Sequence, residues 1–250
     1  MDAWAQLYEA PAALSKDWGH HRIYAPAAYR LVRTASLIPI VHAEILALAT
    51  LFPTCWATTP SGPVLSVLRT LLPDGAGIPG GEKGAVSALP LAFQAYPIVT
   101  PHEEGVEPQR IFVDRAIADA PTDIGAPLML TDGRLARATA ARARTALQAG
   151  RALPATRALS RFLHEEGLLE PWPLRFDLGE GESVDIDHLM VLSRARLDDP
   201  AVYKAIRSFG IEAALFMSTH RLSLFRVSGL LSAAKAAIAA RAKTSSRSAA

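Results

Sequence analysis

Cysteine is almost absent from this chain. Cys55 is the only cysteine in 250 residues, which excludes an intramolecular disulfide framework and any zinc site built from several cysteines. A single cysteine is compatible with a reducing compartment. Half of the residues are hydrophobic, so the chain can bury a sizeable core without covalent cross-links.

Net charge is also low. The 26 basic and 24 acidic residues leave a formal charge of +2, so the molecule as a whole is not a polycation built for nucleic acid. The charges are unevenly placed, however, since seven arginines and no acidic residue lie between residues 133 and 164. We therefore expect no nucleic-acid partner.

The arginine run has a helical period. Arg137, Arg144 and Arg151 repeat every seven residues and so share one face of a helix. Such a face is either solvated or meets phosphate or the acidic surface of a partner. No aromatic residue is interleaved with the run before Phe162, which argues against stacking on single-stranded nucleic acid.

The N-terminus lacks a basic stretch followed by an apolar one, so we expect no secretory signal and a cytoplasmic protein. The apolar run of residues 34–52 has the length of a membrane span, but Pro39, His42 and Glu44 lie near its middle. A central carboxylate costs about 2–3 kcal/mol on insertion scales. We expect a buried strand followed by a core helix here, and no transmembrane span.

Short strands among helices, without regular βαβ spacing, predict an α+β fold. The predicted strands cover residues 36–41, 54–58, 63–71, 98–100, 110–114, 128–130, 174–178 and 183–186. The predicted helices cover residues 42–52, 85–95, 135–150, 154–167 and 200–210, with a mostly helical region continuing to 243. We expect a single domain over residues 1–243, with a mixed or antiparallel sheet packed by helices, and a disordered Ser-rich tail over 244–250.

A glycine-rich loop follows the second predicted strand pair. Residues 75–80 fit the pattern G-x-G-x-x-G, but Pro79 removes a backbone donor that a dinucleotide pyrophosphate would need. Lys83 does not complete a P-loop, because no Ser or Thr follows it. We interpret the segment as a surface loop and predict no cofactor.

Two clusters carry weak catalytic or metal-binding signals. His42 and Glu44 have the H-x-E spacing of zinc deaminases and of some iron sites, but the deaminase pattern lacks its second cysteine. An iron site would need a third ligand from His102, His164, His188 or His220. Glu44 equally suits a cap or ion pair at the start of its helix.

The second cluster is Asp185, Asp187 and His188. On a strand, the two aspartates share one face, which suits a hard cation or an acid/base pair. A structural role for both clusters is the alternative, and we predict no metal. In the C-terminal helical region, Leu231, Ala234 and Ile238 fall on one side, which indicates packing against the domain rather than docking to a membrane.

Five segments, taken in order, resemble one known family. They are residues 37–44, 89–98, 112–114, 127–133 and 218–224, the last containing the sequence His-Arg-Leu-Ser-Leu. Their order and spacing are similar to those of the SapC family, named for a surface-layer-associated protein and distinct from the peptide-transporter permease of similar name. The resemblance implies no catalytic residues. The chain departs from the family pattern before Tyr96, where Gln94 and Ala95 stand in place of an expected arginine. Any function that depends on that arginine in the family is therefore in doubt for this chain.

Three functions remain open at this point. The first is a non-catalytic binding or accessory protein for a peptide, a protein or a small molecule, because no coherent catalytic constellation is present. The second is a metal-dependent or acid/base enzyme that uses the clusters at 42–44 or 185–188. The third is a structural protein of a surface layer, as the family name suggests.

Overall fold

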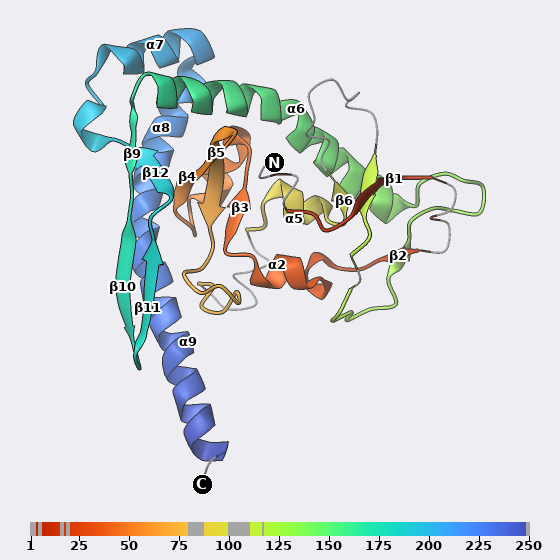
Figure 1. Ribbon diagram of the computed structural model, residues 1–250. Coiled ribbons are helices and arrows are strands. Elements are labelled where there is room, and N and C mark those ends of the chain that lie inside the picture. The colour runs from red at the N-terminus through yellow and green to blue at the C-terminus, as the bar shows by residue number, and fades with distance from the viewer. Residues whose placement is uncertain are drawn as a thin grey trace. The chain divides into compact units, whose positions relative to one another are not determined.

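The computed structural model describes residues 4, 7–15, 18, 21–79, 88–99, 111–116 and 118–248 (Figure 1). The chain forms two compact units, each made of two segments. Unit 1 combines residues 1–33 with 89–154, and unit 2 combines residues 34–88 with 155–250. Antiparallel strands and helices make up both units, so the protein has the α+β fold that the sequence predicts.

A five-stranded antiparallel sheet forms the centre of unit 2, in the order β3-β5-β4-β12-β9. Its strands are β3 (Leu37–Pro39), β4 (Thr54–Thr59), β5 (Gly62–Leu68), β9 (Leu169–Pro171) and β12 (Leu189–Leu192). The first three confirm the strands predicted near these positions. Pro39 is compatible with pairing because β3 is an edge strand, where a missing N–H need not break a ladder.

The predicted helix 42–52 is shorter in the structure. It consists of the 3-10 helix η3 (His42–Glu44) and α3 (Ile45–Leu48), followed by a turn. Pro53 disfavours a helical conformation at Phe52, so the helix does not extend to the end predicted for it. Ile45, Leu48 and Phe52 are buried, so the prediction of a buried strand followed by a core helix is confirmed.

A hairpin of β10 (Leu174–Gly179) and β11 (Glu182–Ile186) confirms the one predicted around residues 179–182. Glu180 and Gly181 both have positive φ values, as a two-residue hairpin turn requires.

Unit 1 contains smaller sheets. One joins β1 (Pro11–Ala13), β7 (Phe112–Asp114) and β6 (Ile98–Val99), and another joins β2 (Arg22–Ile23) and β8 (Ala126–Pro127). Its short helices are η2 (Pro26–Ala28), α2 (Arg30–Thr34, whose last residue belongs to unit 2) and α5 (Leu91–Ala95). Trp18, Ile23, Ile98, Val113 and Leu128 pack in its core with residues of α6.

Two predictions in unit 1 need correction. The strand predicted over 128–130 is absent; Met129 forms only an isolated bridge with Leu135, because the chain turns back over the intervening residues. Of the predicted helix 85–95, residues 88–90 are not helical and Leu91–Ala95 form α5, whereas residues 85–87 lie outside the described part of the chain. Parts of this helix, Lys83, the end of the glycine loop, Arg110 and His102 lie outside the described residues.

Helix α6 (Arg137–Glu165) corrects the two helices predicted at 135–150 and 154–167. It runs through Pro154, although a proline inside a helix costs about 3 kcal/mol. Buried side chains continue at helical spacing on both sides of the proline, at Ala146, Ala149, Leu153, Thr156, Leu159 and Leu163. This continuous buried face explains why the helix does not stop at Gly150.

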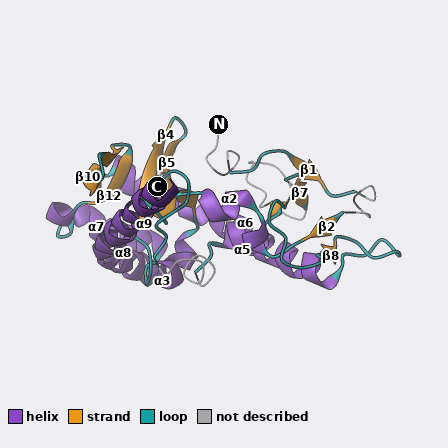
Figure 2. Ribbon diagram, turned by 90° about the horizontal axis from the view of Figure 1, so that it is seen from below, coloured by secondary structure: helices purple, strands orange, loops and turns teal. Residues whose placement is uncertain are grey.

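Five further elements complete the C-terminal region of unit 2. They are α7 (Pro200–Phe209), α8 (Ile211–Ser223) and α9 (Val227–Ser248), with η4 (Arg194–Arg196) before them and η5 (Leu224–Arg226) between the last two. Asp199 accepts a hydrogen bond from the Ala201 N–H (2.9 Å), so the helix start predicted at Asp199-Pro200 is confirmed. Figure 2 shows α7 and α8 side by side, on one side of strands β4, β10 and β12.

Helix α9 packs along β10, as Figure 1 also shows. Leu230, Ala234 and Ile238 are its buried residues, so the predicted packing against the domain is confirmed, with Leu230 in place of the half-buried Leu231. The helix continues to Ser248, whereas the sequence predicted a tail from Thr244; the Ala, Lys and Arg residues before it favour helix continuation.

Among the described residues, the helical run 211–244 is long and apolar enough to cross a membrane, judged by length and composition alone. Of its apolar window, 22% is buried within the protein. The absence of a transmembrane span stays a prediction.

Candidate functional site

His42 and Glu44 both have structural partners. Glu44 is buried, and its Oε2 accepts a hydrogen bond from the Val41 N–H (2.8 Å), which caps the start of η3. The His42 N–H donates to Thr156 Oγ1 (3.1 Å), and His42 Nδ1 lies 2.8 Å from the same oxygen. Burial lowers the pKa of His42, against a smaller opposing effect of Glu212. His42 and Glu44 therefore stabilise the junction between β3 and α3. For Glu44 this is the capping role that the sequence offered as an alternative to metal binding.

Asp185, Asp187 and His188 lie on the surface. Asp185 accepts from Arg175 Nε (3.2 Å) across the hairpin, and Asp187 Oδ1 lies 3.9 Å from His188 Nδ1. Strand β11 ends at Ile186, so Asp187 belongs to the following loop and does not share a strand face with Asp185. Within the described part of the chain, no three His, Cys, Asp or Glu residues are grouped so that they could hold a metal ion.

The arginine stripe keeps its predicted geometry. Arg137, Arg144 and Arg151 are all exposed on the part of α6 that belongs to unit 1. An anionic partner for this stripe stays a prediction.

His220, one of the possible third metal ligands, is fully buried between α8 and the sheet. The Leu192 N–H donates to Nε2 (3.1 Å), so the ring proton lies on Nδ1 and is donated to Thr54 Oγ1 (3.0 Å). Ser223 Oγ accepts from the Thr54 N–H (3.0 Å) and donates to the His220 carbonyl (2.7 Å). Burial, with a smaller contribution from Arg221, lowers the pKa of His220 to about 3, so the ring is neutral.

This network gives a structural reason for the spacing of His220 and Ser223 in the segment 218–224. Three residues apart on a helix, the two side chains share one face and reach β4 and β12 together. Neither is available to bind a ligand. Cys55 is equally enclosed, and burial raises the pKa of its thiol to about 12.

In unit 1, the segments 89–98 and 112–114 meet through Tyr96 and Asp114. The Asp114 carboxylate accepts from the Tyr96 hydroxyl (2.8 Å) and from the N–H groups of Glu9 (3.1 Å) and Ala10 (2.8 Å). Burial, and then the Asp114 charge, raise the pKa of Tyr96. Arg142 of α6 donates to the Tyr96 carbonyl (2.8 Å). A guanidinium thus contacts Tyr96 here, although the residues directly before this tyrosine are Gln94 and Ala95 rather than an arginine.

The glycine loop also has a structural role. Gly77 has a φ of +69°, and a Cβ on it would lie 2.9 Å from the Cα of Ala234 in α9. Arg241 lies seven residues after Ala234, on the same side of α9, and forms an ion pair with Asp74 of the loop. The loop therefore needs glycine at position 77 because α9 packs directly against its backbone.

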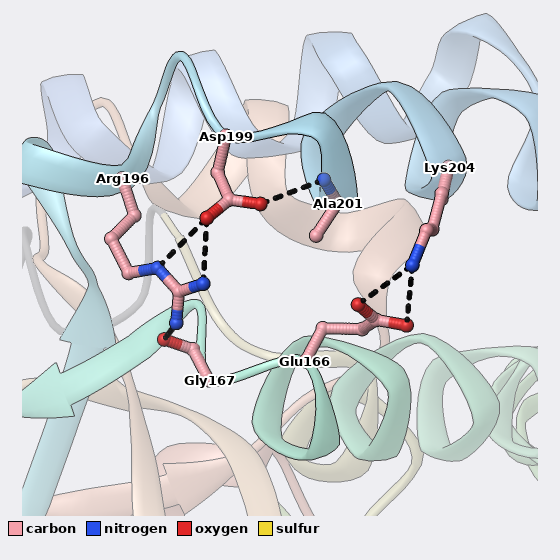
Figure 3. A network of polar contacts seen from close by, with 6 residues as sticks. All are labelled: Glu166, Gly167, Arg196, Asp199, Ala201 and Lys204. Carbon is pink, nitrogen blue, oxygen red and sulfur yellow. Dashed lines mark hydrogen bonds and ion pairs between the residues drawn. The ribbon is translucent and has the colours of Figure 1, made fainter.

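A polar network fixes the start of α7, as Figure 3 shows. Arg196 donates to Asp199 Oδ2 from Nε (3.1 Å) and Nη2 (2.6 Å), and to the Gly167 carbonyl from Nη1 (2.6 Å). Lys204 pairs with Glu166 at the end of α6 (3.3 Å). These contacts hold one side of α7 against the turn after α6, so its other side is presented next to α8.

Exposed apolar side chains lie on α8 and on elements that adjoin it, and the sequence pattern did not single them out: Ile211, Leu215 and Leu222 are on α8, Phe225 on η5, Tyr203 on α7, Leu197 after η4 and Leu46 on α3. Phe225 is 77% exposed, Ile211 74%, Leu222 67% and Tyr203 66%, and Leu46, Leu197 and Leu215 are also exposed. Large apolar residues that are this accessible and share one helix face usually mark a binding surface. The signal in the sequence is the spacing of residues 211, 215, 218, 222 and 225, which places them on one helix face. We call this face the α8 seam.

A groove of about 280 Å³ adjoins the seam between α7 and α8. Its walls are Leu197, Val202, Ile206, Ala214 and Met217, with Ser218 and Arg221 as its polar groups. Arg221 is held in place because its Nη1 donates to the Leu192 carbonyl (2.7 Å). The groove and the seam together form a preformed apolar surface with few polar groups, the usual character of a site for an apolar ligand or side chain.

The comparisons with known proteins agree with the resemblance seen in the sequence. The family model described as SapC matches residues 14–230, which is most of the chain. Searches of curated proteins and of solved structures find no match. The matched region includes the Tyr96–Asp114 contact, the His220 network and both helices of the apolar surface. The chain therefore belongs to the SapC family.

Proposed function

We propose that this SapC-family protein is a non-catalytic binding protein that holds an apolar helical segment of a partner protein on α7 and α8. The observation that carries the proposal is the α8 seam with its adjoining groove. Exposing Ile211, Leu222 and Phe225 to water costs free energy, about 1.5–3 kcal/mol for each side chain that a partner could bury. A binding surface offsets this cost when the partner is present.

The spacing of the seam favours a helix as the bound element. Residues 211, 215, 218, 222 and 225 alternate steps of four and three, the pattern by which one helix packs along another. The groove beside the seam can take side chains from such a helix, as in other helix-in-groove complexes. An extended peptide would instead need an open strand edge beside the apolar side chains.

The two alternative functions have less support. His42, Glu44 and His220 are committed to hydrogen bonds inside unit 2, and Asp185, Asp187 and His188 lie apart from any described groove. Self-assembly into a surface layer is suggested by the family name alone, and no feature of the described residues adds to it.

Photocrosslinking in cells tests the proposal. Replacing Leu222 by a benzophenone amino acid places a short-range crosslinker on the seam, and Ala158, exposed on α6, provides a matched control position. We expect a discrete adduct at position 222 that is absent at position 158 and is lost when Leu215→Arg is added. The same adducts at both positions, or no loss with Leu215→Arg, would contradict the proposal. The mass of the adduct separates a different protein from a second copy of this chain.

A further inference from the structure

The charges beside the α8 seam are mostly positive. Residues 213–250 contain six basic residues and no acidic one. Arg241 is paired with Asp74, so the charges that bear on the seam are those of Arg221, Arg226 and Lys235. Arg226 is exposed and occupies a helix position that flanks the seam, as Arg221 does. Lys235 is also exposed and flanks the continuation of the same helix face along α9, at residues 232 and 236. Among the acidic residues at α7 and α8, Asp199 is paired with Arg196 and Glu166 with Lys204, while Glu212 at the first turn of α8 and Asp198 before α7 are exposed.

The seam lies on the side of the helix opposite to its buried face. His220, Leu230 and Ala234 point into unit 2, whereas Leu222, Phe225 and Gly229 are exposed. Further along, the same face carries the small exposed residues Ser232 and Ala236, which would let another helix approach closely. Two helices packed side by side place charged residues in contact along the flanks of their apolar seam.

From this arrangement we propose that the partner segment is an acidic amphipathic helix, with apolar residues along one face and Glu or Asp at its flanks. This inference rests on the proposed function, because it names the kind of helix that the same surface holds. The Glu or Asp residues at the flanks of the partner helix would pair with Arg226 and Lys235 of this chain. Arg221, which lines the groove, would be available to another of them. Their attraction accelerates association and selects the partner more than it adds affinity.

The same charges disfavour two other occupants. A second copy of this chain would bring its own basic flank, and in a parallel pair Arg221 would face Arg226 of the second copy. An anionic bilayer would attract the basic residues, but Glu212 and Ser218 lie within or beside the apolar face that would have to enter it. Both occupants are outcomes of the test.

The test measures binding of the full chain to two synthetic helical peptides by fluorescence anisotropy. Both are about three heptads long with leucine at the seam positions; one carries Glu at the flanking positions and the other carries Lys. We expect the acidic peptide to bind about tenfold more tightly at low salt, with the difference shrinking as salt is raised. The double variant Arg226→Glu, Lys235→Glu should reverse the preference.

Arg151→Glu is the matched control, because Arg151 is exposed on the part of α6 that belongs to unit 1, whereas the seam belongs to unit 2, and the change should leave the preference unchanged. Equal binding of the two peptides would overturn the acidic partner and leave the proposed function standing. Binding of neither peptide would count against the proposed function itself. Loss of preference in Arg151→Glu would move the acidic site to the arginine stripe of α6.

Two further measurements complete the test. Co-sedimentation with phosphatidylglycerol vesicles measures the affinity for a lipid surface. An affinity higher than that for the acidic peptide, lost in Leu222→Glu, would overturn the inference in favour of a lipid surface. Sedimentation equilibrium that gives twice the mass of the chain, and the monomer mass for Leu222→Glu, would overturn it in favour of self-association.

Discussion

Single residues that carry the family resemblance act here as internal contacts. His220 closes a network with Thr54, Ser223 and the Leu192 N–H, and Asp114 joins β7 to Tyr96 and to the backbone before β1. A buried polar group that loses its partner costs about 1–3 kcal/mol, so each network specifies one arrangement of its neighbours. The sequence allowed the segments to be recognised, but their role depends on partners more than a hundred residues away, which no local pattern reveals.

The neutral state of His220 predicts a pH-dependent stability. Its pKa is about 3 in the folded protein, against an ordinary value of 6.5, so the unfolded chain binds the proton more readily between these values. The contribution of His220 is fully present above pH 6.5 and is lost progressively as the pH falls towards 3. The expected decrease in the free energy of unfolding between pH 7.5 and pH 4.5 is roughly 2–3 kcal/mol from this residue.

Urea unfolding at several pH values measures this effect. His220→Gln should lower stability at pH 7.5 by about 1–3 kcal/mol, because Gln has a donor and an acceptor but not the rigid ring that places them against Thr54 and Leu192. The variant should have a flatter pH dependence than the native chain, because it has no imidazole at this position. His42 has a lowered pKa as well, so a shallower slope of the same sign should remain in the variant. Equal slopes in the two proteins would contradict the assignment of a neutral His220.

At the scale of elements, the contact between the glycine loop and α9 leads to another prediction. Gly77→Ala adds a Cβ that meets the Ala234 backbone and also occupies a left-handed conformation, so we expect a loss of about 2–4 kcal/mol. Gly179→Ala is the control, because Gly179 has a similar φ of +85° with no atom within 4 Å of the added Cβ. It should lose only about 1 kcal/mol. Thermal unfolding followed by circular dichroism compares them, and equal losses would mean that α9 does not pack on the loop.

The elements also show how far the sequence could be interpreted. Caps and turns gave the start of α7 and the β10–β11 hairpin, because Asp199-Pro200 and the glycines at 179 and 181 act locally. Pro154 misled the prediction of α6, because the buried face on both sides of it outweighs the local cost. The seam spacing was present in the sequence, but a helix that buries this face has the same pattern. Only the tertiary packing of α8 shows which face is exposed.

At the scale of the whole molecule, the two units are interleaved along the chain. The backbone passes from one unit to the other at residues 33–34, 88–89 and 154–155, and α6 runs without interruption across the last of these points. Unit 1 cannot form until residues 1–33 and 89–154 meet, and the segment between them belongs to unit 2. Folding that intervening segment reduces the entropy cost of closing unit 1.

We therefore expect both units to unfold in one transition, in line with the single domain predicted over residues 1–243. The native chain should give coincident far-ultraviolet and near-ultraviolet melting curves, and a calorimetric enthalpy equal to the van't Hoff enthalpy. Asp114→Asn in unit 1 and His220→Gln in unit 2 should each lower the same single midpoint, because loss of either network destabilises the shared transition. Two separate transitions, each shifted by only one of the variants, would show instead that the units are independent domains joined by α6.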